Sequence, residues 1–261
     1  MHTHGQTTGS ADEVVVMILL LVAFLVYPFA AMVTSRTYKS WPIRRYLFWM
    51  TGIACVGLTL IGPLAAFAHL NFVGHMMGHL LLGMLAPLLI ALSAPMTLLL
   101  RTLDVRTARK VTNVLKSRPL QFLTNPMTAA ILNIGGLYLL YMTDLYTLMH
   151  QSIFLYALIH FHVFAAGYLF TVSLIYVDVT SHRYSHLYRS LVLIAALAAH
   201  KILAKLIYAS PPAGVARAEA EAGAMWMYYG GDVVDIFLIV ILCAQWYKAT
   251  APRLLTTGDN T

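Results

Sequence analysis

Apolar residues in this chain form long, nearly uninterrupted stretches separated by short polar segments. A helix needs about 20 mostly apolar residues to cross the hydrocarbon core of a bilayer. No stretch shows the ten-residue alternation of a membrane β-barrel, so helices alone can satisfy the backbone in lipid. We therefore expect an all-α integral membrane protein with seven transmembrane helices, at residues 13–34, 46–68, 72–100, 126–147, 153–177, 189–209 and 228–247.

The third predicted span is longer than one crossing requires, and it contains Pro87 and Pro95. Proline lacks an N–H donor and clashes with the preceding turn, so we expect a kink or an early end in this span. The sequence indicates one membrane domain over residues 13–247. An outer tail at 1–12, which carries His2 and His4, and a cytoplasmic tail at 248–261 flank it.

The composition agrees with a membrane protein, because 60% of the residues are hydrophobic and only 10% are charged. There are 17 Lys and Arg against 10 Asp and Glu. In a membrane protein such an excess marks the cytoplasmic loops rather than a nucleic-acid partner. Fourteen of the 17 fall in the loops after spans 1, 3 and 5 and in the C-terminal tail. We therefore expect the N-terminus outside and the C-terminus in the cytoplasm.

The segment from Thr102 to Ser117 combines basic residues with an apolar face. This pattern is typical of an amphipathic helix that lies on the membrane surface. Its favoured role is an anchor to anionic lipid on the cytoplasmic side.

The 11 histidines are the unusual feature of the composition, because polar side chains inside a bilayer cost free energy and tend to mark function. A helical rise of 1.5 Å per residue places His75 about 5 Å and His79 about 10 Å below the outer boundary. His160 comes to about the same depth as His79, and His200 lies slightly deeper. The predicted polar groups therefore gather in the outer half of the bundle.

His75 and His79 are four residues apart and share one helix face. Two imidazoles at this spacing can bind one metal ion, and His160 matches the depth of His79. Met76 adds a thioether, and imidazole with thioether suits copper, especially Cu(I). We therefore expect a metal site formed by His75, His79 and His160. The alternative is interhelical hydrogen bonds without a metal.

Other polar residues are candidates for further ligands or supporting contacts: Met76, His69, His200 and Asp144. Lys201 lies deep in the sixth span and requires a carboxylate. Asp232 and Asp235, at the outer end of the seventh span, are the expected partners in a structural ion pair. A proton or substrate relay is the alternative role for this lysine. We expect no catalytic residues.

The run HMMGHLLLGMLAPLLIALSAPMTLLLR, from His75 to Arg101, resembles the signature span of the caa3-type cytochrome c oxidase assembly factors, the multispan CtaG family. Further similarity lies in Asn125-Pro126, His160, His200 and Met225-Trp226. It covers most of the chain, from about residue 40 to 247. The resemblance implies a non-enzymatic protein of the bacterial cytoplasmic membrane that helps to mature a terminal oxidase by supplying copper to it. An oxidase subunit and the lipid bilayer would be its partners, and the sequence leaves homo-oligomerisation open.

Two other function classes fit some of these residues. A seven-span zinc hydrolase would use three imidazoles, a water and a carboxylate such as Asp144. A copper transporter or a haem protein with His79 and His160 as axial ligands is the other alternative. Bound zinc would favour the hydrolase and a Soret band the haem protein. The inner halves of the spans lack the polar path that a transporter needs.

Overall fold

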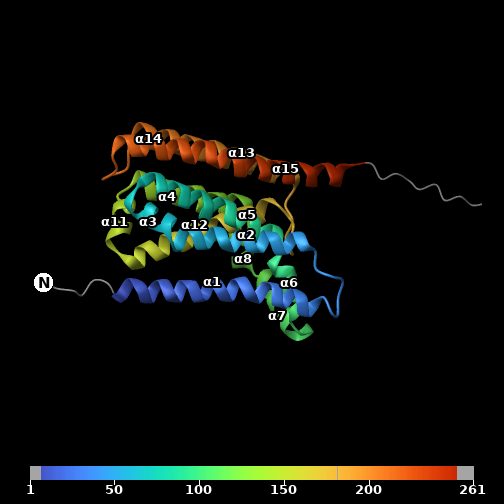
Figure 1. Cartoon of the computed structure of the whole chain (residues 1–261). Coiled ribbons are helices and arrows are strands. Elements are labelled where there is room, and N and C mark those ends of the chain that lie inside the picture. Colours follow the sequence, from blue (N-terminus) through green and yellow to red (C-terminus); the bar gives the residue numbers. More distant parts are fainter. Residues whose placement is uncertain (1–6, 181, 252–261) are drawn as a thin grey trace, which may run out of the picture.

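The computed structural model describes residues 7–180 and 182–251, with side chains from residue 13 onward, and this part of the chain is helical with no strand. Figure 1 shows an elongated bundle whose long helices run side by side. Two long helices, Phe72–Ser93 and Arg217–Thr250, are each built from three consecutive segments, which are described below. The other elements are α1 (Thr7–Thr34), α2 (Ile43–Leu60), α3 (Pro63–Leu70), α6 (Pro95–Thr102), α7 (Val105–Leu115), α8 (Arg118–Leu123), α9 (Pro126–Ala130), η2 (Ile131–Gly135), α10 (Gly136–Met142), α11 (Leu145–Gln151), α12 (Ile153–Leu174) and α13 (His186–Ala209).

Five helices are long and apolar enough to cross a membrane, and two bent helix pairs raise the number to seven if each pair crosses once. The bent pairs are α2 with α3, at 46°, and the segment Pro126–Met142 with α11, at 81°. These elements overlap the seven predicted stretches, although several of them begin or end at other residues. The predicted tails are shorter than expected, because α1 begins at Thr7 and the last helix ends at Thr250. The remaining tail residues, with His2 and His4, lie outside the described residues.

The third predicted span is one helix from Phe72 to Ser93, built from α4 (Phe72–His79), η1 (Leu80–Leu85) and α5 (Ala86–Ser93). Pro87 lies in the first turn of α5, directly after the π-helical turn η1, and does not end the span. The span ends at Ala94, which adopts the left-handed conformation with φ 55°, and Pro95 opens the separate helix α6. The apolar stretch to residue 100 therefore ends early as a span, at Ser93 directly before Ala94 and Pro95, which is one of the two outcomes expected from its prolines.

The last predicted span begins earlier than residue 228. A 34-residue helix runs from Arg217 to Thr250 through α14 (Arg217–Met225), η3 (Trp226–Gly230) and α15 (Gly231–Thr250). The added segment RAEAEAGAM is rich in alanine and glutamate, which favour helices strongly. Hydropathy alone does not register that propensity, so the predicted span starts too late.

Three π-helical turns interrupt the long helices: η1 after α4, η2 between α9 and α10, and η3 before α15. Each widens one helical turn and shifts the direction of the side chains that follow. Such turns are rare and occur frequently at functional sites. All three contribute to, or directly precede, residues of the candidate site described below.

The two larger of three apolar clusters form the core of the bundle. One contains Phe72, Leu140 and Ile207 toward the end of the molecule that carries His150, and we call this end the outer end after its predicted orientation. The other cluster, which includes Leu88 and Phe170, lies toward the opposite end, which we call the inner end. The clusters are joined where α12 packs closely against η1. The backbones are so near each other there that an added Cβ on Gly167 would lie 2.0 Å from the carbonyl oxygen of Gly83. Only glycine permits this approach.

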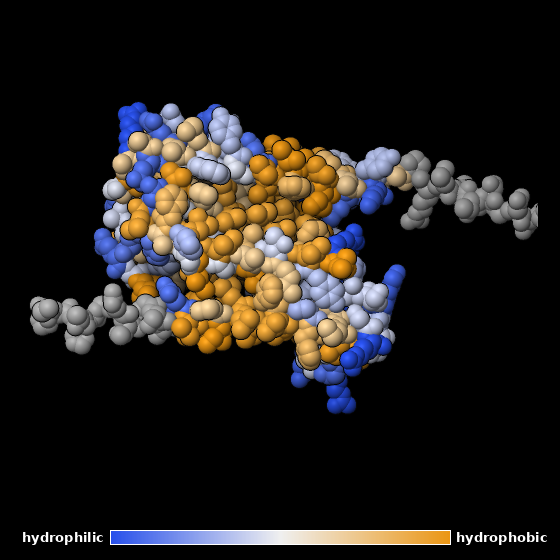
Figure 2. Space-filling model, viewed as in Figure 1, coloured by the Kyte–Doolittle hydropathy of each residue, from blue (hydrophilic) through white to orange (hydrophobic). Residues whose placement is uncertain are grey.

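Hydrophobic residues cover the central part of the surface, and hydrophilic residues gather at its two ends (Figure 2). Helix α1 illustrates this pattern: it packs against α2 and α6 while Leu19, Leu25 and Phe29 are exposed. An apolar band between polar ends is the surface that a bilayer requires. The chain is therefore a membrane protein.

The predicted amphipathic helix at 102–117 is present as α7, over the shorter range Val105–Leu115. Asp104 caps its N-terminus by accepting hydrogen bonds from the backbone N–H groups of Arg106 and Thr107. Hydrogen bonds from Thr107 and Arg106 lower the pKa of Asp104 below its usual range. None of the residues of α7 is buried, as expected of a helix on a surface.

Candidate functional site

Four histidines lie together at the outer end, and we call them the outer histidine group: His69, His75, His150 and His160. The His75 ring on α4 lies 6.5 Å from the His160 ring on α12 and 6.4 Å from the His150 ring on α11. His75 is buried, and its Nε2 atom is 3.0 Å from the hydroxyl of Tyr141 on α10. His69 is exposed and stacks on Tyr156, which also contacts His160.

The hydrogen bond of His160 fixes which of its nitrogens can bind a metal. Its Nδ1 atom lies 2.8 Å from the carbonyl oxygen of Tyr156. A carbonyl oxygen only accepts, so Nδ1 carries the hydrogen and Nε2 keeps a free lone pair. Histidine ligands in metalloproteins are commonly oriented by this kind of hydrogen bond. His160 is therefore arranged as an Nε2 ligand.

His79 and His200 form a second group, one helical turn further from the outer end, which we call the deep histidine pair. Their ring centroids are 6.1 Å apart, and 7% and 4% of the two residues are exposed. Neither ring nitrogen of either residue has a hydrogen-bond partner among the described residues. Leaving a buried polar atom unpaired costs about 1–3 kcal/mol. A ligand between the rings would recover part of this cost.

Two small cavities adjoin His79. The first, of about 20 Å³, is lined by His75, His79, His160 and Tyr141. The second, of about 30 Å³, has His79 and His200 in its wall together with Met84, Asn133 and Asp235. Each is large enough for one water molecule or an ion of similar size. His79 thus forms the wall between them.

The π-helical turns supply much of the second cavity. Met84 lies in η1, Asn133 lies in η2, and Asp235 follows η3 in the first turns of α15. At the end of η3, Gly231 faces the ring of His200, where an added Cβ would lie 2.9 Å from Cε1. The backbone of α15 therefore packs directly against this imidazole.

The three predicted ligands, His75, His79 and His160, border one cavity, and the structure also sets His79 against His200. Among the described residues, no set of three or more His, Cys, Asp or Glu side chains has the geometry of a metal site. A complete ligand set would need a donor of another type, and Met84 is one in the second cavity.

The other predicted site residues are divided between the site and the rest of the molecule. His200 lies in the deep pair. Met76 is fully buried in the outer apolar cluster and does not line either cavity. Asp144 is exposed at the start of α11 and also lies outside the two cavities.

Tyr141, Met84 and Asn133 are the site residues that sequence reasoning missed. Tyr141 stands near the end of the fourth predicted span, in the outer half where the histidines were expected, and that position was the available signal. Met84 and Asn133 gave no signal, because an isolated methionine or asparagine in an apolar span is consistent with simple packing.

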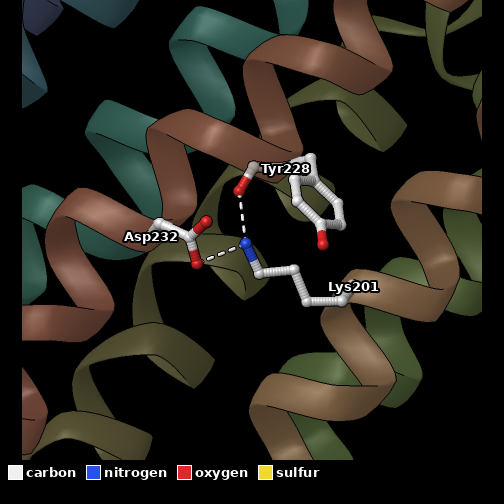
Figure 3. Close-up of polar contacts among 3 residues, drawn as sticks. All are labelled: Lys201, Tyr228 and Asp232. Atoms are coloured by element: carbon white, nitrogen blue, oxygen red, sulfur yellow. Dashed lines mark hydrogen bonds and ion pairs between the residues drawn. The ribbon is translucent and has the colours of Figure 1, made fainter.

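Lys201 pairs with Asp232 and donates a hydrogen bond of 2.6 Å to the carbonyl oxygen of Tyr228, as Figure 3 shows. Its ammonium also lies 3.8 Å from the centroid of the Tyr228 ring. Asp235 does not take part in this ion pair. It is 4% exposed, and its Oδ2 atom has no hydrogen-bond partner among the described residues.

The chain was compared with known proteins. It is 34% identical to the uncharacterized protein Mb0105 of Mycobacterium bovis over 157 residues, which is 58% of this chain and 23% of that protein. It is 26% identical to the uncharacterized protein ML1998 of Mycobacterium leprae over 234 residues, 82% of this chain and 36% of the relative. The chain thus spans between a quarter and about a third of the length of these relatives. No solved structure matches it.

The sequence also matches the family described as cytochrome c oxidase caa3 assembly factor over residues 14–249, which is nearly the whole chain. That range includes the outer histidine group, the deep histidine pair and all three π-helical turns. The chain belongs to the family of caa3-type cytochrome c oxidase assembly factors.

Proposed function

We propose that this protein, in the bacterial cytoplasmic membrane, binds copper in the outer half of its helix bundle and delivers it to the oxidase that it helps to assemble. It acts as a metallochaperone and not as an enzyme. Copper is the cargo, taken up at the outer end as Cu(I) and passed sideways to an oxidase subunit. The observation that carries this proposal is the deep histidine pair, with four buried ring nitrogens that have no hydrogen-bond partner in the part of the chain that the structure describes.

Copper first enters the cavity bordered by His75, His79 and His160. The Nε2 lone pair of His160 and the ring of His79 are the ligands available there. The bond between His75 and Tyr141 has to open before His75 can contribute Nε2. This competition makes the first cavity a site of entry rather than of tight binding.

From there copper moves to the second cavity, between His79 and His200. No hydrogen bond competes for these imidazoles. Met84 supplies a soft sulfur, so the donor set suits Cu(I) better than a hard cation. His79 borders both cavities and can keep hold of the ion while the other ligands exchange.

The test is metal analysis of the detergent-purified protein after loading with copper under reducing conditions. The variant with both His75→Ala and His79→Ala should lose stoichiometric copper. His162→Gln is the control, because His162 lies on α12 close to His160 in sequence but bonds to the carbonyl oxygen of Leu132 at 3.1 Å and lines neither cavity. Copper per protein that is unchanged in the double variant would reject this site.

The same preparation decides between the alternatives. Stoichiometric zinc, with hydrolysis of an amide-linked lipid, would favour the hydrolase. A Soret band that disappears in His79→Ala would favour haem. Delivery is tested in cells: removal of the protein should lower the copper content of the oxidase, and the wild-type chain but not the double variant should restore it.

A further inference from the structure

An open pocket lies at the inner end of the molecule, far along the bundle from the outer histidine group and the deep histidine pair. It has a volume of about 380 Å³ and lies between the segment that follows α12, the first turn of α13 and the end of α15. Four of the side chains that line it are basic: Arg183, His186, Arg189 and Lys248. No aspartate or glutamate is among the lining residues.

Arg189 is the buried part of this pocket, with only 1% of the residue exposed. Its Nη1 atom donates a hydrogen bond of 2.6 Å to the carbonyl oxygen of Leu174 and a longer one, of 3.3 Å, to Oε1 of Gln245. The guanidinium lies 4.1 Å from the centroid of the Tyr176 ring. Its Nε atom has no hydrogen-bond partner among the described residues.

The positive charge of Arg189 therefore has no anionic partner within residues 7–180 and 182–251. The two ion pairs of the described residues involve Lys201 and Arg217 instead. Arg183 places a second guanidinium 5.9 Å from the same Tyr176 ring. Keeping a buried guanidinium without a counter-charge is unfavourable, and like charges nearby increase the cost. An anion in the pocket would remove both penalties.

We propose that this pocket binds the phosphate group of an anionic ligand, with Arg183, Arg189 and Lys248 as its recognition residues. Guanidinium groups match the geometry of phosphate oxygens and form the stronger, charge-assisted hydrogen bonds with them. Basic pockets between helices at the cytoplasmic face are typical binding sites for phospholipid headgroups. The ligand is the headgroup of an anionic phospholipid or free phosphate, which share this chemistry.

The surroundings of the pocket favour the lipid source. His186 stacks on Trp246 with ring centroids 6.0 Å apart, and Trp246 and Leu187 are exposed beside it. Tryptophan is enriched where a membrane protein meets the lipid headgroups. A phospholipid could thus place its phosphate in the pocket and its acyl chains against the apolar surface next to it. This site is independent of copper binding.

The test uses the full chain in detergent, titrated with short-chain phosphatidylglycerol, with short-chain phosphatidylcholine and with inorganic phosphate. Arg189→Gln is a poor variant, because it also removes the bond to the Leu174 carbonyl and endangers folding. The two exposed basic residues at the rim are changed together instead, Arg183→Gln with Lys248→Gln. The matched control removes two exposed charges on the same predicted side, Arg36→Gln with Arg44→Gln.

We expect phosphatidylglycerol to bind the wild type more tightly than phosphatidylcholine, and the rim variant to bind it about tenfold more weakly. The control variant should bind like the wild type. Binding of inorganic phosphate that is lost in the rim variant would also support the site and would identify free phosphate as the ligand. Equal binding of phosphatidylglycerol by wild type and rim variant, or no binding of either anion by the wild type, would overturn the proposal.

Discussion

His75 and His79 lie one turn apart on the same helix and share a burial of more than nine-tenths, yet their surroundings differ. His75 is hydrogen-bonded to Tyr141, whereas both nitrogens of His79 lack a partner. His150 and His160 of the outer histidine group are also hydrogen-bonded, whereas neither member of the deep histidine pair has a hydrogen-bond partner among the described residues. Hydrogen-bonded imidazoles have a structural explanation, whereas unpaired ones in an apolar core leave room for a bound water molecule or ion. In the proposed function, the deep pair is therefore the place where copper is held.

The largest expected effect comes from removing either member of the deep pair. His79→Ala and His200→Ala should each weaken Cu(I) binding by about 100-fold or more, because each removes a direct ligand. His75→Ala should weaken Cu(I) binding by about tenfold or less, because His75 is hydrogen-bonded to Tyr141 and does not belong to the deep histidine pair. Competition titrations with a Cu(I) chelator measure all three. An equal loss of Cu(I) affinity in His75→Ala and His79→Ala would show that the outer histidine group and the deep histidine pair do not differ in copper binding.

A second prediction concerns the close approach of α12 and η1, which holds His160 and His79 near each other. Gly167→Ala should destabilise the protein by about 1–3 kcal/mol, because its Cβ would overlap the carbonyl of Gly83. Gly78→Ala is the control, since an added Cβ there meets no atom within 4 Å. Thermal unfolding in detergent measures both. A Gly167→Ala protein as stable as the control would show that this contact is looser than the structure indicates.

Tyr141→Phe tests the comparison between the two groups, because it removes the hydrogen-bond partner of His75. Loss of the hydroxyl should cost about 1 kcal/mol of stability, and copper affinity should rise severalfold because His75 no longer has a competing partner. Tyr138→Phe is the matched control: it removes a bond of 3.0 Å to the carbonyl of Ala199, away from both cavities. A rise in copper affinity in the control as well would contradict this role of Tyr141.

The smallest expected effects concern two carboxylates on α15, those of Asp232 and Asp235. Asp232→Asn breaks a partly exposed ion pair with Lys201 and should cost no more than about 1 kcal/mol, with copper binding unchanged. Asp235→Asn should change copper affinity severalfold, because Asp235 lines the second cavity. Copper titration of the two variants side by side makes the comparison. A larger change for Asp232→Asn would support a relay role for Lys201.

Hydropathy predicted the positions of the helices, because the length of an apolar stretch is set by the bilayer itself. It did not predict the helical start of the last span at Arg217, which depends on alanine and glutamate propensity. Hydropathy did not predict the π-helical turns either. They arise from tertiary packing, and the glycines and prolines near them have several other structural explanations.

The sequence predicted that the site histidines lie toward one end of the bundle, but it did not predict how they pair. The spacing of His75 and His79 placed both on one face, yet it did not show that Tyr141 and His200 approach that face from different helices. Lys201 was expected beside Asp232 or Asp235, and the structure pairs it with Asp232. Asp235 lies about one turn further along α15 and faces the cavity instead. Such choices depend on helix rotation, which a single sequence does not specify.

The most direct test of copper binding at the deep histidine pair is X-ray absorption spectroscopy of the Cu(I)-loaded protein and its variants. The wild-type spectrum should show the multiple scattering of at least two imidazoles around copper. His75→Ala should leave this pattern in place, whereas His79→Ala should abolish it. A copper ion without imidazole scattering in the wild type, or an identical spectrum in His79→Ala, would contradict the account.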